Sequence, residues 1–237
     1  MLTRRYRASI YLHAALTTCR IGRRFRGTLV SEVPVTPELP NNPADGDELI
    51  FSVGHSNHDI ARFLQLLTDH QIEVVADVRT SPFSRYSPHF NREPLSKVLR
   101  EAGIGYVFLG KELGGRPDGT EYYDIEGHVR YDRLSLSELF NNGIERLVQG
   151  ANDHRVAMVC SEGDPAQCHR HLLIARVLHE RGVRVVHIES DGSTSSYESV
   201  AERTPVQRSL FDGEEEGQWR SPLSVLHSTA QSPSSAD

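Results

Sequence analysis

The sequence predicts an α/β fold: a single Rossmann-like domain with a mostly parallel sheet of about five strands and helices on both faces. Two observations carry this prediction. Short, continuously apolar runs alternate along the chain with segments whose apolar residues recur at helical spacing. The runs lack the polar–apolar alternation of a half-exposed sheet, which favours a parallel sheet covered on both sides. The predicted domain spans residues 48–190, between tails at 1–47 and 191–237.

The predicted elements follow one another in a regular order. Five apolar runs predict strands at residues 49–53, 73–78, 106–109, 156–159 and 184–189. Between them, apolar residues at helical spacing predict helices over 60–67, 95–103, 135–149 and 165–178. Ser56 and Asp59 resemble a capping box before the first helix, and Asp164 with Pro165 predicts the start of the last one. The carboxyl ends of the strands then share one edge of the sheet, where open α/β folds bind ligands.

Composition restricts the class of protein. The chain has 237 residues and a formal net charge of −6, which suits one sizeable domain and gives no general sign of nucleic-acid binding. Three cysteines are too few, and odd in number, for a secreted disulfide scaffold, so we expect a cytoplasmic protein. No apolar run approaches the roughly 18 residues that span a bilayer, so we expect no membrane association.

The two ends of the chain differ from the middle. The first thirty residues hold seven arginines and no acid, and a proline-rich linker follows up to residue 47. This composition resembles an organellar transit peptide, and a plain disordered extension is the simpler explanation. Residues 191–237 are rich in Ser, Glu and Pro with few large apolar side chains. We therefore expect both ends, 1–47 and 191–237, to be disordered.

Polar and ionisable residues cluster after four of the predicted strands. Charged groups in a cleft cost desolvation, so we expect them to serve a ligand there. The free N–H groups at the start of the last predicted helix favour an anion. The clusters are His55 and Ser56; Asp77 and Arg79; Lys111 and Glu112; and Cys160 and Glu162 with Cys168, His169 and Arg170.

The residue types predict separate roles in that crevice. We expect Asp77 or Glu162 to act as general acid or base, and His55 and His169 to position groups or carry protons. Cys168 is the predicted nucleophile or redox group, because a helix start lowers a thiol pKa. The predicted phosphate-binding residues are Arg79, Arg85, Arg170, Ser56 and Asn91.

Simpler explanations stay open for several of these residues. His55 suits a capping role, Asp77 and Arg79 suit an ion pair, and Cys160 suits a small apolar position at a strand end. Zinc is a competing interpretation, because His55, Cys160, Cys168 and His169 are ligand types for that metal. The Cys-x7-Cys-His spacing matches no standard structural zinc pattern, so we predict a site without a metal or cofactor.

The loop after the second predicted strand mixes positive charge with aromatic rings. Phe83, Tyr86 and Phe90 lie among Arg79, Arg85, Arg92, Lys97 and Arg100. Guanidinium groups contact phosphates, and aromatic faces stack on bases. The loop therefore indicates DNA or a nucleotide as partner, and aromatic packing onto the core is the alternative.

Taken together, these motifs resemble one family. Gly54-His55-Ser56, Asp77-Val-Arg79, Leu113-Gly114-Gly115 and Cys160-x-Glu162-x-x-Pro165-x-x-Cys168-His169-Arg170 are similar to those of the domain of unknown function 488 family, over about residues 49–190. The resemblance implies an α/β fold and an intracellular protein, and no settled activity. The chain also looks superficially like rhodaneses and cysteine-based phosphatases. Their Cys-x5-Arg loop is shorter than the segment from Cys160 to Arg170, which argues against their mechanism.

A second resemblance lies near the carboxyl end. Residues 207–211, Gln207-Arg-Ser-Leu210-Phe211, are similar to the bacterial sliding-clamp binding pentapeptide Gln-Leu-x-Leu-Phe. Arg208 departs from the usual Leu. Such peptides insert apolar anchors into a pocket of the partner. The resemblance implies the sliding clamp as a partner through Gln207, Leu210 and Phe211, and a chance apolar pair is the alternative.

We therefore expect a cytoplasmic enzyme, a hydrolase or lyase, that acts on nucleic acid or a nucleotide in DNA repair or processing. Two alternatives stay open. One is a non-catalytic module that binds nucleic acid or a nucleotide. The other is a thiol-dependent transferase or hydrolase that acts on small molecules.

Overall fold

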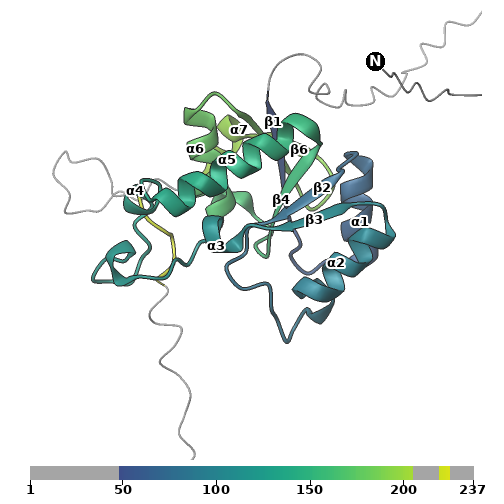
Figure 1. Ribbon diagram of the computed structural model, residues 1–237, viewed down its shortest axis with the longest axis horizontal. Coiled ribbons are helices and arrows are strands. Elements are labelled where there is room, and N and C mark those ends of the chain that lie inside the picture. Colours follow the sequence, from purple (N-terminus) through teal and green to yellow (C-terminus); the bar gives the residue numbers. More distant parts are fainter. Residues whose placement is uncertain (1–47, 205–218, 225–237) are drawn as a thin grey trace, which may run out of the picture. The chain divides into compact units, whose positions relative to one another are not determined.

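The computed structural model describes residues 48–204 and 219–224, which form one six-stranded sheet with helices packed against it (Figure 1). The strands cross the sheet in the order β3-β2-β4-β1-β5-β6, in which β1 to β5 are parallel and β6 is antiparallel to β5. The predicted α/β class with a mostly parallel sheet is confirmed. The strands are β1 (Leu49–Gly54), β2 (Val74–Asp77), β3 (Gly105–Phe108), β4 (Val156–Cys160), β5 (Arg184–Ile188) and β6 (Thr194–Ser196).

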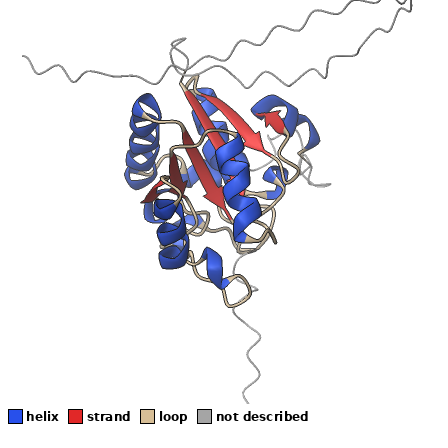
Figure 2. Cartoon of the chain, turned by 90° about the vertical axis from the view of Figure 1, so that its right-hand side faces the viewer, coloured by secondary structure: helices blue, strands red, loops and turns tan. Residues whose placement is uncertain are grey.

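Helices cover both faces of the sheet (Figure 2). On one face, the apolar side chains of α1 (Ile60–Asp69) and α2 (Arg92–Glu101) join a buried core with Phe51 and Val53 of β1. On the other face, α5 (Glu138–Asp153) and α6 (Arg176–Glu180) pack with a second set of apolar strand residues, which includes Ile50, Met158 and Val185. Successive side chains of a strand point to opposite faces of the sheet, so the apolar strands contribute side chains to both cores.

The shorter helices lie in the connections. They are the α-helices α3 (Gly110–Leu113), α4 (Tyr131–Leu134) and α7 (Tyr197–Arg203), the 3-10 helices η2 (Pro88–Phe90), η3 (Thr120–Tyr122) and η4 (Pro165–Gln167), and the π-helix η5 (Arg170–Ala175). Asp59, rather than the expected Ser56, caps α1 by accepting a hydrogen bond from the Arg62 amide at 2.7 Å. None of the described helices combines the length and the apolar character that crossing a bilayer requires.

The connections place a crevice at the carboxyl end of β4. The chain leaves β1 and β2 for helices on one face and leaves β4 for helices on the other, although β4 lies between those two strands. Loops that diverge in this way open a gap at the strand ends, which is where ligands bind in open α/β sheets. In the register of the sheet, Cys160 at the end of β4 lies beside Gly54 of β1.

The prediction of disorder after residue 191 is wrong for residues 191–204 and 219–224. A turn at Gly192, whose φ is +97°, leads into β6, and the Ser196 side chain then caps α7. Farther on, the Trp219 indole donates a hydrogen bond to the Leu172 carbonyl at 2.7 Å. These elements left no sign in the sequence, because the segment is rich in Ser and Glu. Few large side chains, such as Val200 and Trp219, hold the elements in place. Residues 1–47 and the pentapeptide at 207–211 lie outside the described residues.

Candidate functional site

A cavity of about 370 Å³ opens at the carboxyl end of β4. Four stretches that are distant in the sequence line it: the loop after β2 at residues 79–81, the turn at 115–116, several residues of 160–169, and the segment 221–223. The buried side chain of Tyr131 completes the wall. The cavity falls within the usual size of small-molecule sites. The predicted convergence of polar residues at this edge is therefore found, although only some of the predicted residues reach the cavity.

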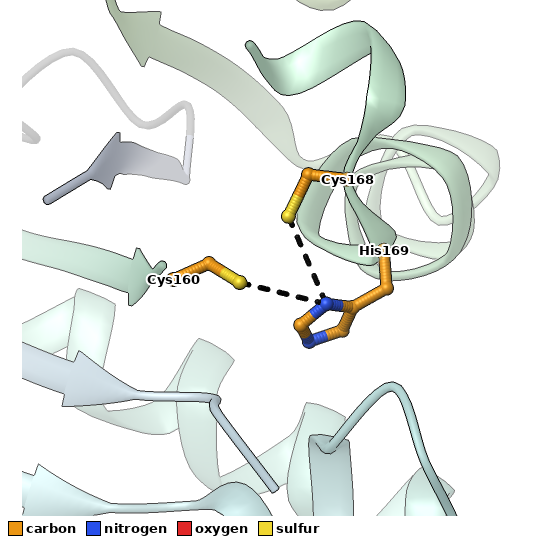
Figure 3. A group of neighbouring side chains, drawn as sticks. All are labelled: Cys160, Cys168 and His169. Carbon is orange, nitrogen blue, oxygen red and sulfur yellow. Dashed lines mark hydrogen bonds between the residues drawn. The ribbon is translucent and has the colours of Figure 1, made fainter. Parts of the chain in front are cut away.

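Two thiols and one imidazole form the chemical centre of the cavity (Figure 3). The Nδ1 atom of His169 lies 3.7 Å from the sulfur of Cys160 and 3.7 Å from the sulfur of Cys168. The opposite ring atom, Nε2, lies 3.1 Å from the Val78 carbonyl oxygen. Because a carbonyl only accepts hydrogen bonds, Nε2 carries a proton and Nδ1 is directed at the two sulfurs.

The environment divides the two thiols into an acidic one and a weakly acidic one. The pKa of Cys160 lies well below its ordinary value, because the Cys168 thiol donates a hydrogen bond to its sulfur and because the charge of His169 favours the thiolate over the opposing effect of burial. The pKa of Cys168 lies well above its ordinary value, because the thiol is buried and because it donates a hydrogen bond to the Cys160 sulfur. Burial lowers the pKa of His169, but the negative Cys160 sulfur outweighs it and the net change is upward.

This division corrects the expectation that Cys168 has the lowered pKa. The expected continuous helix from Pro165 is absent: Asp164 caps the short 3-10 helix η4, and the chain then turns through Cys168 and His169 into the π-helix η5. Cys168 therefore does not sit on the amino-terminal turn of an α-helix, whose dipole lowers a thiol pKa. π-helical turns are rare and often occur at functional sites, which agrees with this position beside the cavity.

Arg170 holds the loop that follows β4. Its side chain is fully buried, and it donates hydrogen bonds to the backbone carbonyls of Glu162 and, at 2.8 Å, of Gly163. It does not line the cavity, so the predicted role in binding phosphate is not supported. Its guanidinium instead fixes the loop between the two cysteines and adds a positive charge that favours the Cys160 thiolate.

Glycines allow the neighbouring loops to approach this loop closely. A Cβ atom at Gly115 would lie 2.7 Å from Cγ of the His169 ring, and one at Gly54 would lie 2.0 Å from the Glu162 carbonyl oxygen. A methyl group does not fit at either distance. The Gly-Gly and Gly-His-Ser motifs are thereby explained by packing around the thiol loop.

Asp77 and Arg79 form the ion pair that was the simpler alternative. Arg79 donates from Nε and from a terminal nitrogen to the two Asp77 oxygens, at 2.9 and 2.6 Å, and the Tyr106 hydroxyl donates at 2.7 Å. Asp77 is fully buried and does not line the cavity, whereas Arg79 does. The expected acid–base role of Asp77 thus lacks access to the cavity, and its carboxylate positions Arg79.

His55 also lies outside the cavity wall. Its Nδ1 lies 3.0 Å from the Ser56 carbonyl oxygen, and its ring stacks on Phe90 with centroids 4.2 Å apart. Burial lowers the pKa of His55 to about 4, so the ring is neutral near pH 7. His55 therefore helps to hold the loop after β1 and does not meet the expectation of a proton carrier at the cavity.

The remaining predicted residues divide between two surfaces. Glu162 is exposed at the cavity rim and also borders a second, open depression of about 650 Å³, together with Ser56. Asn91 accepts a hydrogen bond from the Ser84 amide at 2.7 Å and shapes its own loop, and Arg85 is exposed on that loop. Neither residue lines the cavity. Of the predicted phosphate-binding residues, Arg79 is the one on its wall.

Several cavity residues were missed. Arg116, Ser161 and Gln167 supply polar groups to the wall, and Ser221 to Leu223 close one side. Arg116 follows the Gly114-Gly115 pair, and that pair was the available signal. For residues 221–223 no signal existed, because their place depends on the bond between the Val129 amide and the Ser221 hydroxyl, at 2.9 Å.

Three donor atoms in this cluster have ligand types that suit a metal. In the described part of the chain, the sulfurs of Cys160 and Cys168 and one nitrogen of His169 lie within 4.8 Å of one another and form the one such group. His55, the fourth expected candidate, is not part of it. A structural zinc site takes four protein ligands, so these residues could hold a metal only with an open coordination position.

Comparison with known proteins gives a match to a protein-family model. The family model described as "Domain of unknown function DUF488" matches residues 59–177. No curated protein and no solved structure matches the chain. The matched stretch includes Gly115, Cys160, Cys168 and His169, whereas β1 and the cavity residues 221–223 lie outside it.

Proposed function

The chain belongs to the family described as "Domain of unknown function DUF488", and from that premise we propose that it is a thiol-dependent enzyme whose nucleophile is Cys160. One observation carries the proposal. The Cys160 sulfur lies on the wall of the 370 Å³ cavity, 3.7 Å from an imidazole nitrogen whose ring is fixed from behind by a backbone carbonyl. A nucleophile, an adjacent base and a group that orients the base are the parts that covalent catalysis by a thiol requires.

Each group has a distinct part in the reaction. The thiolate of Cys160 attacks an electrophilic atom of a substrate held in the cavity and forms a covalent bond to sulfur. His169 balances the negative charge before the attack and gives a proton to the leaving group afterwards. Val78 keeps the ring of His169 in the tautomer that this exchange needs. The reaction therefore passes through a covalent intermediate on the Cys160 sulfur.

The cavity wall favours a small, polar substrate. Arg79 and Arg116 contribute positive charge, and Ser161 and Gln167 contribute neutral polar groups. The Arg79 guanidinium is already positioned by Asp77, so it loses little further freedom on binding. We propose that an anionic group of the substrate lies against Arg79 and Arg116.

Selective alkylation tests the proposal. The chain has a third cysteine, Cys19, outside the described residues, so the starting protein carries Cys19→Ser. Iodoacetamide at pH 6.5 and mass mapping of the peptides should show modification of Cys160 first. Cys160→Ser should abolish the rapid phase, and Cys168→Ser, the matched control, should retain an alkylated Cys160. Modification of both cysteines at the slow rate of an ordinary thiol would refute the proposal.

A second candidate function, action on nucleic acid or a nucleotide, is favoured by the loop that begins at the cavity. Phe83 and Tyr86 are 71% and 90% exposed, and Arg85 between them is exposed as well. Exposed aromatic rings beside a guanidinium suit the stacking of bases. Phe90, by contrast, is buried against Phe63, as the packing alternative expected.

Binding of a fluorescent oligonucleotide over a salt series tests this second function. Phe83→Ala with Tyr86→Ala should weaken binding by about tenfold or more, since stacking contributes roughly 1–3 kcal/mol per base. Leu136→Ala, which removes another exposed apolar side chain, is the control. The proposed link to DNA repair predicts in addition that Leu210→Ala with Phe211→Ala abolishes binding to the sliding clamp. Unchanged affinities in both assays would remove the nucleic-acid hypothesis.

A further inference from the structure

Cys168 has no chemical part in a mechanism with a single nucleophile, although its sulfur faces the same cavity. Both cysteines are free and buried, and both line the cavity wall. Their sulfurs and the His169 nitrogen lie within 4.8 Å of one another, and the side chains point toward the same ring atom (Figure 3). A transfer or hydrolysis reaction needs one thiol, whereas an exchange of electrons between thiols and a disulfide needs a pair.

We propose that Cys160 and Cys168 act as a dithiol pair that reduces a small disulfide substrate and closes a reversible disulfide bond between their own sulfurs. This inference rests on the proposed function, because it uses Cys160 as the nucleophile. It names the substrate class for the same cavity: a low-molecular-weight disulfide with anionic groups, which Arg79 and Arg116 would contact.

The reaction balances in two steps. In the first, the Cys160 thiolate attacks one sulfur of the substrate, the substrate S–S bond breaks, and the departing thiolate takes the proton from His169. In the second, the now neutral His169 accepts the proton of the Cys168 thiol, and the Cys168 sulfur attacks the Cys160 sulfur. The mixed disulfide breaks, and the second substrate thiolate takes the proton from His169. The substrate gains two electrons, and the cysteine pair loses them.

The shared imidazole suits both steps without a large movement. His169 Nδ1 lies at the same distance from each sulfur, 3.7 Å, so it can give a proton beside Cys160 and take one from Cys168. To close the disulfide, the two sulfurs must come together until they are about 2.05 Å apart, the length of an S–S bond. The connection between them contains no regular α-helix, only a loop and the short η4, which lets the side chains move toward each other. The bond would close a short loop whose first part is already held by Arg170.

Oxidation with a defined disulfide tests the inference. The Cys19→Ser protein is incubated with oxidised glutathione, the remaining thiols are blocked, and the peptides are mapped by mass spectrometry. We expect a peptide that joins Cys160 to Cys168, release of two molecules of reduced glutathione per chain, and return of both thiols on addition of dithiothreitol. This measurement needs no active-site substitution, so a variant that fails to fold does not affect it.

Two variants then separate the steps. Cys168→Ser should accumulate a stable glutathione adduct on Cys160, because the resolving thiol is absent, and Cys160→Ser should form no adduct on Cys168. An oxidised wild-type pair without a Cys160–Cys168 bond, or equal adduct levels in the wild type and Cys168→Ser, would overturn the inference. Stoichiometric zinc that holds both thiols and blocks oxidation would overturn it as well. If one of these results is found although Cys160 is alkylated selectively in the same preparation, the dithiol inference fails while the proposed function stands.

Discussion

Gly115 packs directly against the imidazole of His169: a Cβ atom at this position would lie 2.7 Å from Cγ of the ring and 3.0 Å from Nδ1. The turn that carries Gly115 is held in turn by the Arg116 amide, which donates to the Thr80 hydroxyl at 3.0 Å. The position of the base thus depends on the absence of a side chain in a separate loop.

The first prediction follows from this contact. Gly115→Ala should displace the His169 ring and weaken its stabilisation of the Cys160 thiolate. The alkylation rate of Cys160 at pH 6.5 should then fall by about tenfold, which corresponds to a loss of about 1.4 kcal/mol or one unit of pKa. Gly150→Ala is the matched control, since the nearest heavy atom to its Cβ lies 3.9 Å away and the added methyl fits. The rates are measured by mass spectrometry of samples quenched at set times. Equal rates for the two variants would argue against the contact between Gly115 and His169.

The second prediction concerns His169 itself. His169→Gln removes the positive charge beside Cys160, so the Cys160 pKa should rise toward its ordinary value and alkylation at pH 6.5 should fall by about tenfold or more. At pH 9.5, where an ordinary thiol is also ionised, the difference should largely disappear. His89→Gln, which changes a half-buried histidine away from the cavity wall, should leave the rate unaltered. A rate deficit of the same size at both pH values would contradict the charge argument.

The third prediction concerns Arg170, whose hydrogen bonds hold the loop that follows β4. Arg170→Met should lower the free energy of unfolding by about 2–5 kcal/mol, because the backbone carbonyls of Glu162 and Gly163 lose a charged donor that is itself fully buried. Arg100→Met, on an exposed position of α2, should change it by less than about 0.5 kcal/mol. Urea denaturation followed by circular dichroism measures both. A mild effect at Arg170 would show that the loop holds its shape without the guanidinium.

The fourth prediction is a pH dependence of stability that originates behind the site. Ser52, His187 and His171 form a buried chain, with 2.6 Å between the Ser52 oxygen and His187 and 3.1 Å between the two histidines. Burial lowers the pKa of His171 to about 4 and that of His187 to about 2. The unfolded chain therefore binds more protons than the folded one below about pH 6.5, and stability should fall as the pH decreases from there to 4.

The expected slope is up to about 1.4 kcal/mol per pH unit for each histidine. His187→Asn should reduce the slope of the unfolding free energy between pH 6.5 and 4, whereas His154→Asn, in the exposed turn after α5, should preserve it. If the slopes of the wild type and His187→Asn coincide, the buried histidines do not protonate on unfolding in this range.

Much of the fold was predictable because the signals are local. Each of the five parallel strands is a run of apolar residues, and residues that follow their carboxyl ends necessarily meet at one edge. The cluster of Cys160, Cys168 and His169 was within reach of this argument. Which cysteine is the thiolate was not, because the answer depends on a hydrogen bond between the two and on burial, and neither appears in the spacing.

The roles of two arginines illustrate the same limit. Arg79 and Arg170 look alike in the sequence, each following a strand or beginning a helix with acids nearby. In the structure Arg79 reaches the cavity on the support of Asp77, whereas Arg170 turns inward to backbone carbonyls. Trp219 and the neighbouring residues 221–223 were missed for a related reason: their contacts join segments far apart in the chain.

The pH–rate profile of alkylation at Cys160, measured by peptide mapping in the Cys19→Ser protein, tests most directly whether Cys160 is the thiolate of the cavity. We expect the rate at Cys160 to show an inflection well below the pH range of an ordinary thiol, while Cys168 stays unmodified. An inflection for Cys160 near pH 8.5, the ordinary range for a thiol, or faster reaction at Cys168, would contradict it.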